Sequence, residues 1–332
     1  MNQGFWEKLK KPIMVLAPMA DVTDAAFRRL IAKYGRPDVT WTEFVSADGL
    51  CHPDGRKKLL IDLAYTEAER PIVAQLFSGN PEKMFEAAKL VRELGFDGLD
   101  INMGCPDRSI EKSGAGAILI KNPAQARAVI RAAKEGAGGL PVSVKTRIGY
   151  NKNELETWLP ELLEEHPAVV TIHARTRKEM SLVPARWEHV KRAVEIRNEL
   201  KSETLIFGNG DVLNLDDARA KVHETGCDGV MLGRAIFGNP FLFSDLRKKK
   251  RPEASEGQPQ MESVSGRLQV MLEHTKLFDE LFHGIKNFAI MKKHYKAYVQ
   301  GFDGSKELRI KLMEAENVAD VERVVTEYLK SL

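Results

Sequence analysis

Short apolar segments alternate with longer amphipathic segments over the first three quarters of the chain. The apolar segments lie at residues 13–17, 39–44, 72–76, 98–102, 142–146, 169–173, 205–207 and 229–232. Their length and lack of polar alternation predict parallel β-strands that are buried on both faces. Helical periodicity predicts helices at 24–32, after the Asn-Pro pairs at 80–81 and 122–123, and at 155–164, 187–199 and 214–224.

Strand and helix repeat eight times over roughly 235 residues, which predicts an α/β fold of the (β/α)8 TIM-barrel type over residues 1–246. A doubly wound open sheet is the alternative fold, and it would place a GxGxxG turn after the first strand. Here that turn reads Ala17-Pro18-Met19-Ala20-Asp21. Such a turn cannot cradle a pyrophosphate in that way, so the pattern favours the barrel.

The alternation ends near residue 247. Residues 247–264 begin Arg-Lys-Lys-Lys-Arg and continue with Pro, Glu, Ser, Gly and Gln, a composition typical of a linker. Apolar spacing then predicts helices around 268–277, 285–299, 308–314 and 318–329. Residues 265–332 are therefore predicted to form a small C-terminal helical bundle domain.

Composition says more about the size of the core and the cellular compartment than about the function. The chain has 332 residues, of which 43% are hydrophobic, and this is enough for one large core and a smaller one. Its net charge is only +3. No apolar run approaches the ~20 residues of a membrane helix, and residues 1–11 have no signal-peptide core. The three cysteines form no CxxC pair. We expect a cytoplasmic monomer without a metal site or a membrane partner.

Polar residues and glycines follow most of the predicted strands. In a (β/α)8 barrel, reactive side chains lie at the carboxyl ends of the strands. Each residue alone has a structural explanation, such as a strand-end cap, a satisfied core histidine or a turn glycine. Because all of them follow predicted strands of the barrel, we interpret them as parts of a single functional site. The candidates are Pro18, Met19, Gln75, Asn102, Cys105, Lys145, Arg147, His173, Arg175, Asn209, Gly210, Asp211, Gly233 and Arg234.

Cys105 is the candidate reactive group among these. It lies between Gly104 and Pro106 just past a strand end, where glycine permits and proline fixes an unusual backbone. A buried structural cysteine is the alternative, because free cysteine often behaves as a small hydrophobe. That alternative suits Cys227 better, since Cys227 precedes an apolar strand.

The residues after the last two strands predict a phosphorylated cofactor. Barrels commonly bind phosphate there through backbone N–H groups, and Gly210 and Gly233 permit close approach. Lys145 can stabilise an anionic ring, and Gln75 offers both a donor and an acceptor to a planar heterocycle. These features favour flavin mononucleotide (FMN). A phosphosugar would use the tail site but neither Gln75 nor the apolar Pro18-Met19 platform.

These motifs resemble the tRNA-dihydrouridine synthase family along the whole barrel, and the C-terminal Lys292-Lys293-His294-Tyr295 resembles that family's RNA-binding domain. Asn102-Met103-Gly104-Cys105-Pro106 is the most specific match. The other matching motifs are Ala17-Pro18-Met19, Val144-Lys145-Thr146-Arg147, His173-Ala174-Arg175-Thr176, Gly208-Asn209-Gly210-Asp211 and Gly233-Arg234.

The resemblance implies reduction of the C5–C6 double bond of selected tRNA uridines with FMN and NADPH. It implies that Cys105 protonates C5 as a general acid while hydride reaches C6. Asn102 and Arg147 would bind uracil, and Arg175 would bind phosphate or RNA. The implied cofactor-binding residues are Pro18, Met19, Gln75, Lys145, His173, Asn209, Gly210, Asp211, Gly233 and Arg234.

The tRNA partner has its own support in the charge distribution. Residues 283–300 contain Lys286, Lys292, Lys293 and Lys296, no acidic residue, and interleaved aromatic residues. Such a run is often only a solvated face. With the resemblance, it predicts a surface that follows RNA phosphates.

Two other functions remain open at this stage. A flavin barrel that reduces a small free molecule, similar to dihydroorotate dehydrogenases or ene-reductases, would explain the barrel residues but not the basic bundle. A non-catalytic RNA-binding protein would explain the lysines but not Cys105. Bound flavin in the purified protein would exclude the non-catalytic RNA-binding protein. A comparison of activity on tRNA with activity on free uracil would then distinguish a tRNA-dihydrouridine synthase from a small-molecule reductase.

Overall fold

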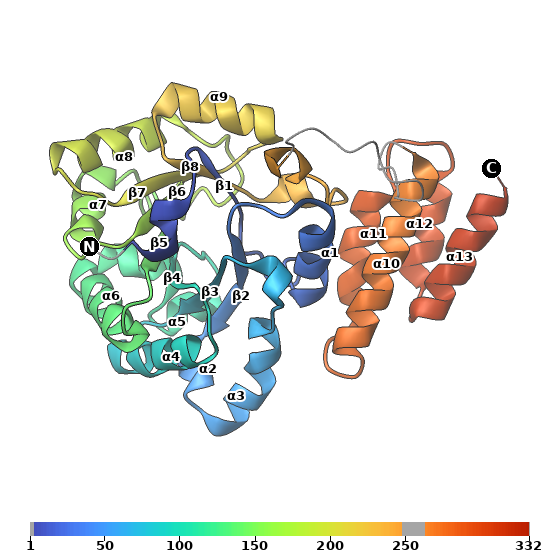
Figure 1. The fold of residues 1–332 in the computed structure, drawn as a ribbon, viewed down its shortest axis with the longest axis horizontal. Coiled ribbons are helices and arrows are strands. Elements are labelled where there is room, and N and C mark those ends of the chain that lie inside the picture. Colours follow the sequence, from blue (N-terminus) through green and yellow to red (C-terminus); the bar gives the residue numbers. More distant parts are fainter. Residues whose placement is uncertain (1–2, 248–262, 332) are drawn as a thin grey trace. The chain divides into compact units, whose positions relative to one another are not determined.

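Eight parallel strands form a single closed sheet in the computed structural model, which describes residues 3–247 and 263–331 (Figure 1). Hydrogen-bonded neighbours follow the order β1-β8-β7-β6-β5-β4-β3-β2, and a parallel bridge between Val15 and Val39 joins β1 to β2. The predicted (β/α)8 barrel is confirmed. Its strands are β1 (Ile13–Leu16), β2 (Thr40–Ser46), β3 (Ile72–Phe77), β4 (Gly98–Met103), β5 (Val142–Arg147), β6 (Val169–His173), β7 (Leu205–Asn209) and β8 (Gly229–Leu232).

Helices alternate with the strands largely as the pattern predicted. Both Asn-Pro pairs start a helix, because Asn80 and Asn122 accept a backbone N–H of the first turn while the proline occupies its first position. The helices between the strands are α1 (Ala25–Gly35), α2 (Ala47–Leu50), α3 (Pro53–Leu59), α4 (Pro81–Glu93), α5 (Arg108–Lys112), α6 (Pro123–Ala137), α7 (Leu155–Leu163), α8 (Glu188–Glu199) and α9 (Leu215–Thr225).

The amino end of the barrel is filled with apolar side chains. The 3₁₀ turn Gly4–Lys8 contributes Trp6, whose ring lies 5.8 Å from that of Trp41 and 5.6 Å from that of Phe207. Ile13, Val15 and other inward-facing residues complete this cluster. Ligands and water are therefore excluded from this half of the barrel.

The carboxyl end of the same barrel is polar. Side chains alternate along a strand, so Asp100 and Asn102 of β4 share one face, as do Ser143, Lys145 and Arg147 of β5. Register then places Arg147 beside His173, and His173 beside Asn209, on adjacent strands. A ring of polar groups consequently surrounds the mouth.

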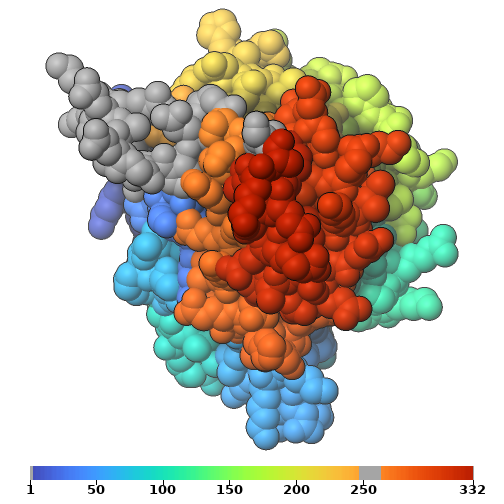
Figure 2. Space-filling model, turned by 90° about the vertical axis from the view of Figure 1, so that its right-hand side faces the viewer, coloured from blue at the N-terminus to red at the C-terminus, as the bar shows by residue number. Residues whose placement is uncertain are grey.

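The C-terminal helices form part of a second compact unit. They are α10 (Val264–Phe282), α11 (Met291–Tyr298), α12 (Ser305–Glu314) and α13 (Val318–Lys330), and Figure 2 shows one face of this unit in orange and red. The expectation of one helix over 285–299 is wrong at its start. Gly284 adopts a positive φ of 71°, and Asn287 caps a 3₁₀ turn before α11. Lys286 therefore lies outside α11.

The second unit also recruits an early helix. Residues 20–36 and 235–332 cluster together, whereas residues 1–19 and 37–234 form the barrel unit. This division differs from the boundary expected at residue 246, because α1 packs its buried Phe27 ring against His274 at 4.7 Å. Asp24 caps α1 by accepting the N–H of Phe27. Most of the linker expected at 247–264 lies outside the described residues.

Candidate functional site

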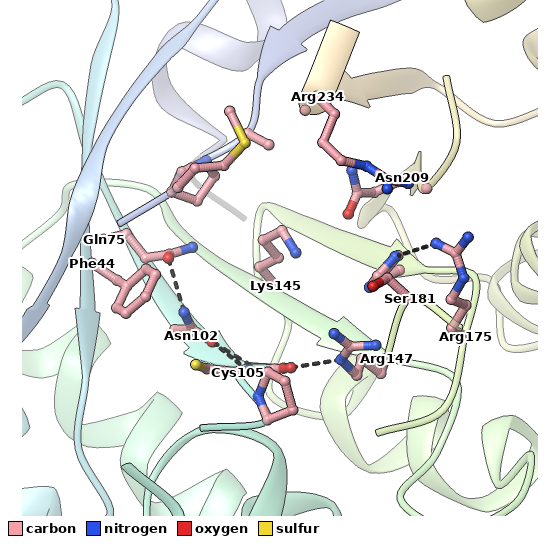
Figure 3. A pocket seen from close by; sticks show the side chains of 18 of the residues that line it. Phe44, Gln75, Asn102, Cys105, Lys145, Arg147, Arg175, Ser181, Asn209 and Arg234 are labelled. Atoms are coloured by element: carbon pink, nitrogen blue, oxygen red, sulfur yellow. Dashed lines mark hydrogen bonds between the residues drawn. The ribbon is translucent and has the colours of Figure 1, made fainter. Parts of the chain in front are cut away.

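A pocket of about 290 Å³ opens at the carboxyl ends of the strands (Figure 3). It lies within the barrel unit, and every barrel residue predicted for the site lines it. These are Pro18, Met19, Gln75, Asn102, Cys105, Lys145, Arg147, His173, Arg175, Asn209, Gly210, Asp211, Gly233 and Arg234. The structure therefore brings the predicted barrel residues together around one pocket, while their roles remain predictions.

Asn102 shapes the loop that carries Cys105. Its Oδ1 accepts the backbone N–H of Gly104 at 3.1 Å and that of Cys105 at 2.9 Å. Its Nδ2 donates to Gln75 Oε1 at 3.1 Å. Only one N–H of the amide is left for a ligand, so most of the hydrogen-bonding capacity of Asn102 fixes the cysteine loop.

A buried carboxyl group lies behind this amide pair. Gln75 Nε2 donates to Asp100 Oδ2 at 2.6 Å, and Ser143 Oγ donates to Asp100 Oδ1 at 2.5 Å. Complete burial raises the pKa of the Asp100 carboxyl to about 6, against the opposing effect of its hydrogen bonds. The chain Ser143–Asp100–Gln75–Asn102 thus links the wall of the pocket to the position of Cys105.

The Cys105 side chain is protonated at neutral pH. Burial raises the pKa of its thiol above the ordinary value, and the nearby Lys145 and Arg147 only partly oppose this. The loop is also tightly folded, because a Cβ at Gly116, where φ is +69°, would lie 2.8 Å from Cys105 O. A fixed, partly exposed thiol that keeps its proton can serve as a general acid.

Lys145 points into the pocket, opposite Arg175 and between Asn102 and Asn209 in the view of Figure 3. Burial, reinforced by the charge of Arg147, lowers the pKa of its ammonium to about 8. Within the described ranges, its Nζ makes no direct hydrogen bond or ion pair. A desolvated cation of this kind favours an anionic ligand.

Arg147, the last residue of β5, joins the loops that follow β4 and β6. Its Nε donates to Gly104 O at 2.7 Å, and its Nη1 donates to Thr176 O and Met180 O, both at 3.1 Å. Burial lowers the pKa of the guanidinium to about 10, so the group stays charged at neutral pH. Its remaining donors face the pocket that also contains Cys105.

A second cationic cluster lies at the ends of β6, β7 and β8. Asp211 accepts from Arg175, from Arg234 at 2.6 Å and from the backbone N–H of Ala185 at 2.9 Å. These bonds lower the pKa of the Asp211 carboxyl. Gly210 adopts a φ of +121°, and a Cβ there would lie 2.9 Å from Ala185 Cβ and 3.0 Å from the His173 ring.

The pocket has a net positive charge. His173 Nε2 lies 3.2 Å from Arg175 Nη1, and a guanidinium can only donate, so the imidazole accepts there. Burial and the surrounding cations hold the pKa of His173 well below its usual range. Among the lining residues, Lys145 and three arginines therefore face one carboxylate and a neutral imidazole.

Some residues of the site were not predicted. Asp100 was missed because it lies within an apolar run. Its two-residue spacing from Asn102 places it on the same face of β4, and this spacing could have identified it. Phe44 reaches the pocket because the register of β2 shifts between Trp41 and Phe44, which no sequence pattern indicates. Ser181 lines the pocket from the loop after β6, where sequence has little periodicity.

The predicted RNA-binding lysines lie in the second unit, and none of them is among the residues that line the pocket. Lys293 and Lys296 are exposed on α11, away from its buried residues Met291 and Tyr295, whereas Lys292 is partly buried. Lys293 donates to Asp21 Oδ2 at 3.0 Å, an exposed pair of small energetic value. Lys286 lies over the Phe282 ring at 4.9 Å.

No cluster of three or more histidine, cysteine, aspartate or glutamate side chains in residues 3–247 and 263–331 could hold a metal ion. Over the same residues, no helix combines the length and apolar character needed to cross a bilayer.

Fold and pocket together define a (β/α)8-barrel protein whose chemistry-bearing side chains converge at the carboxyl ends of the strands, the arrangement typical of barrel enzymes. The model of the dihydrouridine synthase (Dus) family matches residues 15–332, and the chain belongs to that family. The predicted family is thereby confirmed.

Similar proteins agree over nearly the whole length. The chain is 39% identical over 330 residues to the probable tRNA-dihydrouridine synthase 2 of Bacillus subtilis (strain 168), covering 99% of this chain and 97% of that protein. It is 38% identical to the probable tRNA-dihydrouridine synthase of Staphylococcus aureus (strain MRSA252), covering 99% and 96%.

Solved structures support the fold. Morphinone reductase matches with a TM-score of 0.52 at 14% identity, covering 74% of this chain and 88% of that chain. Histamine dehydrogenase from Rhizobium sp. 4-9 matches with a TM-score of 0.53 at 14% identity, covering 80% and 48%. At this identity the likeness concerns the barrel alone.

Proposed function

We propose that this protein is an FMN-dependent tRNA-dihydrouridine synthase that uses NADPH as its electron donor. One observation carries the proposal. In a chain of the dihydrouridine synthase family, a protonated thiol and an ammonium that has no direct partner among residues 3–247 and 263–331 line the same cationic pocket. Reduction of uracil needs a proton donor and a cation near the electron source, and this pocket offers both.

The pocket residues fit FMN. Gly210 and Gly233 lie beside Arg234 at the carboxyl ends of β7 and β8, where barrels bind phosphate. A Cβ at Gly233 would occupy space 3.7 Å from Ala17 Cβ and 3.8 Å from Met19 Sδ, so glycine keeps this side open. We assign the ring to Pro18, Met19, Gln75 and Lys145, and the phosphate side to His173, Asn209, Gly210, Asp211, Gly233 and Arg234.

When bound, FMN supplies hydride to C6 of uracil. The chain supplies the proton: Cys105 Sγ holds it at neutral pH and donates it to C5, because burial keeps its pKa high. Asn102 orients this thiol through the backbone of the loop. Lys145 would place a positive charge beside the FMN ring, while Arg147 and the remaining N–H of Asn102 would bind the uracil carbonyls.

The substrate is proposed to be tRNA, as the names of the bacillary and staphylococcal relatives state for those proteins. A uridine stacked in folded RNA must be extracted before it reaches the pocket, which costs a few kcal/mol. Lys292, Lys293 and Lys296 offer phosphate contacts that offset this cost, as does Lys286 in the preceding turn. Arg175, which lines the pocket, offers a further contact to phosphate or RNA. A cytoplasmic monomer is consistent with this role.

The test compares wild type with Cys105→Ala, and uses Cys51→Ala as the matched control because Cys51 is also partly buried but does not line the pocket. All three proteins should purify with FMN and oxidise NADPH. Dihydrouridine formation in tRNA, counted by mass spectrometry, should fall by roughly 10²–10⁴ only in Cys105→Ala.

Other outcomes separate the alternatives. Near-normal dihydrouridine formation by Cys105→Ala would make Cys105 structural. A colourless wild-type protein that binds tRNA would indicate a non-catalytic RNA-binding protein. Reduction of free uracil in preference to tRNA would indicate a small-molecule reductase.

A further inference from the structure

The loop after β6 presents an apolar tip to solvent beside the pocket. Met180, Leu182 and Val183 are 46%, 84% and 36% exposed, in a run of exposed residues that extends to Pro184. Ser181, between them, lines the pocket, and Figure 3 shows it beside Arg175. Large apolar side chains gathered at the rim of a polar site indicate a contact surface.

The base of this loop is held rigidly, although its tip is exposed. Arg147 donates to Met180 O at 3.1 Å, and Arg175 donates to Val183 O at 2.6 Å. Arg177 forms a charge-assisted pair with Glu111 of α5, and its Nη2 donates to Pro106 O at 3.2 Å. Met180 keeps a positive φ of 51° within this frame. The tip is therefore preorganised and loses little conformational entropy on binding.

Cations adjoin the apolar tip. The loop after β5 pairs with this one, since Lys178 N donates to Tyr150 O at 2.9 Å. Lys178 and Lys152 are exposed and make no ion pair within the described part of the chain. Lys121 lies 3.9 Å from the Tyr150 ring centroid. Apolar surface next to uncompensated positive charge matches a nucleotide, which has an apolar base face and an anionic phosphate.

We propose that Met180 and Leu182 pack against the base of the nucleotide next to the extracted uridine. Lys178 and Lys152 then face its phosphates. Extraction leaves the neighbouring base without a stacking partner, and an apolar tip at the rim can cover its exposed face. This inference rests on the proposed function and adds a positioning surface to it, because neither side chain lines the pocket.

The test uses the double variant Met180→Ser with Leu182→Ser, Leu182→Trp, and Leu200→Ser as the matched control. Leu200 is 51% exposed and follows α8, at the opposite end of the barrel unit. The double variant should raise the KM for a tRNA transcript roughly ten-fold, and Leu182→Trp should keep or lower it, because base stacking is commonly worth that much. FMN content and the KM for NADPH should match wild type in all three.

A second readout addresses the base itself. A 2-aminopurine placed next to the uridine that wild type reduces should change its fluorescence on binding wild type, and less on binding the double variant. An unchanged tRNA KM in the double variant, or a raised KM for NADPH, would overturn the inference while wild-type activity upholds the proposed function. A wild-type protein that forms no dihydrouridine would overturn both.

Discussion

Acid should destabilise the second unit through two buried histidines. His274 and His294 are fully buried, their ring centroids lie 4.4 Å apart, and Phe27 packs against both. None of the four ring nitrogens has a hydrogen-bond partner among the described residues. Both rings are therefore neutral, since a charged imidazole would be desolvated without compensation.

The magnitude follows from the pKa values. Burial, with a smaller effect of Lys293, lowers the pKa of His294 from 6.5 to about 3, and burial places that of His274 well below its usual range. Between the unfolded and folded pKa values, the unfolded chain binds more protons, so stability falls as pH falls. From pH 7 to pH 5, each ring removes about 2 kcal/mol from the free energy of unfolding, or about 4 kcal/mol together.

The assay is urea unfolding of the full chain followed by circular dichroism at both pH values, with amide hydrogen exchange to locate the change in α10 and α11. The variant His274→Leu with His294→Leu should lose this part of the pH dependence. His283→Asn, which changes an exposed histidine, should retain it. Equal pH dependence in wild type and the leucine variant, or NMR titration of either ring near pH 6.5, would refute the reasoning.

Three further variants test the proposed site and the RNA surface. Lys145→Gln should weaken FMN binding, and wild-type affinity should itself fall as pH rises through about 8, where the ammonium loses its proton; a flat pH profile in flavin titrations would contradict this. Asn102→Ala should slow tRNA reduction by roughly 10–100-fold in single turnovers, because it removes the acceptor that holds the cysteine loop; an unchanged rate would make that contact dispensable. Replacing Lys292, Lys293 and Lys296 with Ala should weaken tRNA binding and flatten its salt dependence by roughly one phosphate contact per lysine, while FMN content stays constant. Equal salt slopes would leave these lysines as a solvated face.

The barrel and the position of its pocket were predictable because both follow from local rules. A buried parallel strand reads as a short apolar run, and the carboxyl-end rule then selects the residue after it. Gln75, Lys145 and His173 come from different strands, yet they line one pocket. Their positions at the ends of successive predicted strands were enough to predict that they lie together.

The hydrogen-bond partners and the burial of the individual side chains were not predictable. Asn102 was expected to bind uracil, whereas most of its amide holds the Cys105 loop and Gln75. Such partners depend on register between strands that are distant in sequence. The same holds for Asp100, whose charge state depends on its burial beneath Gln75. The start of α11 depended on one local turn at Gly284, which the apolar spacing did not report.

The division of the chain has a consequence for exchanging domains between relatives. The polypeptide passes between the two units three times, after Met19, after Arg36 and after Arg234. Cutting the gene near codon 235 would separate α1 from α10 and leave the Phe27 ring without the imidazoles that cover it. A hybrid that takes its C-terminal helices from a relative must therefore also replace residues 20–36 with those of the same donor, so that the ring at position 27 and the residues that cover it come from one protein.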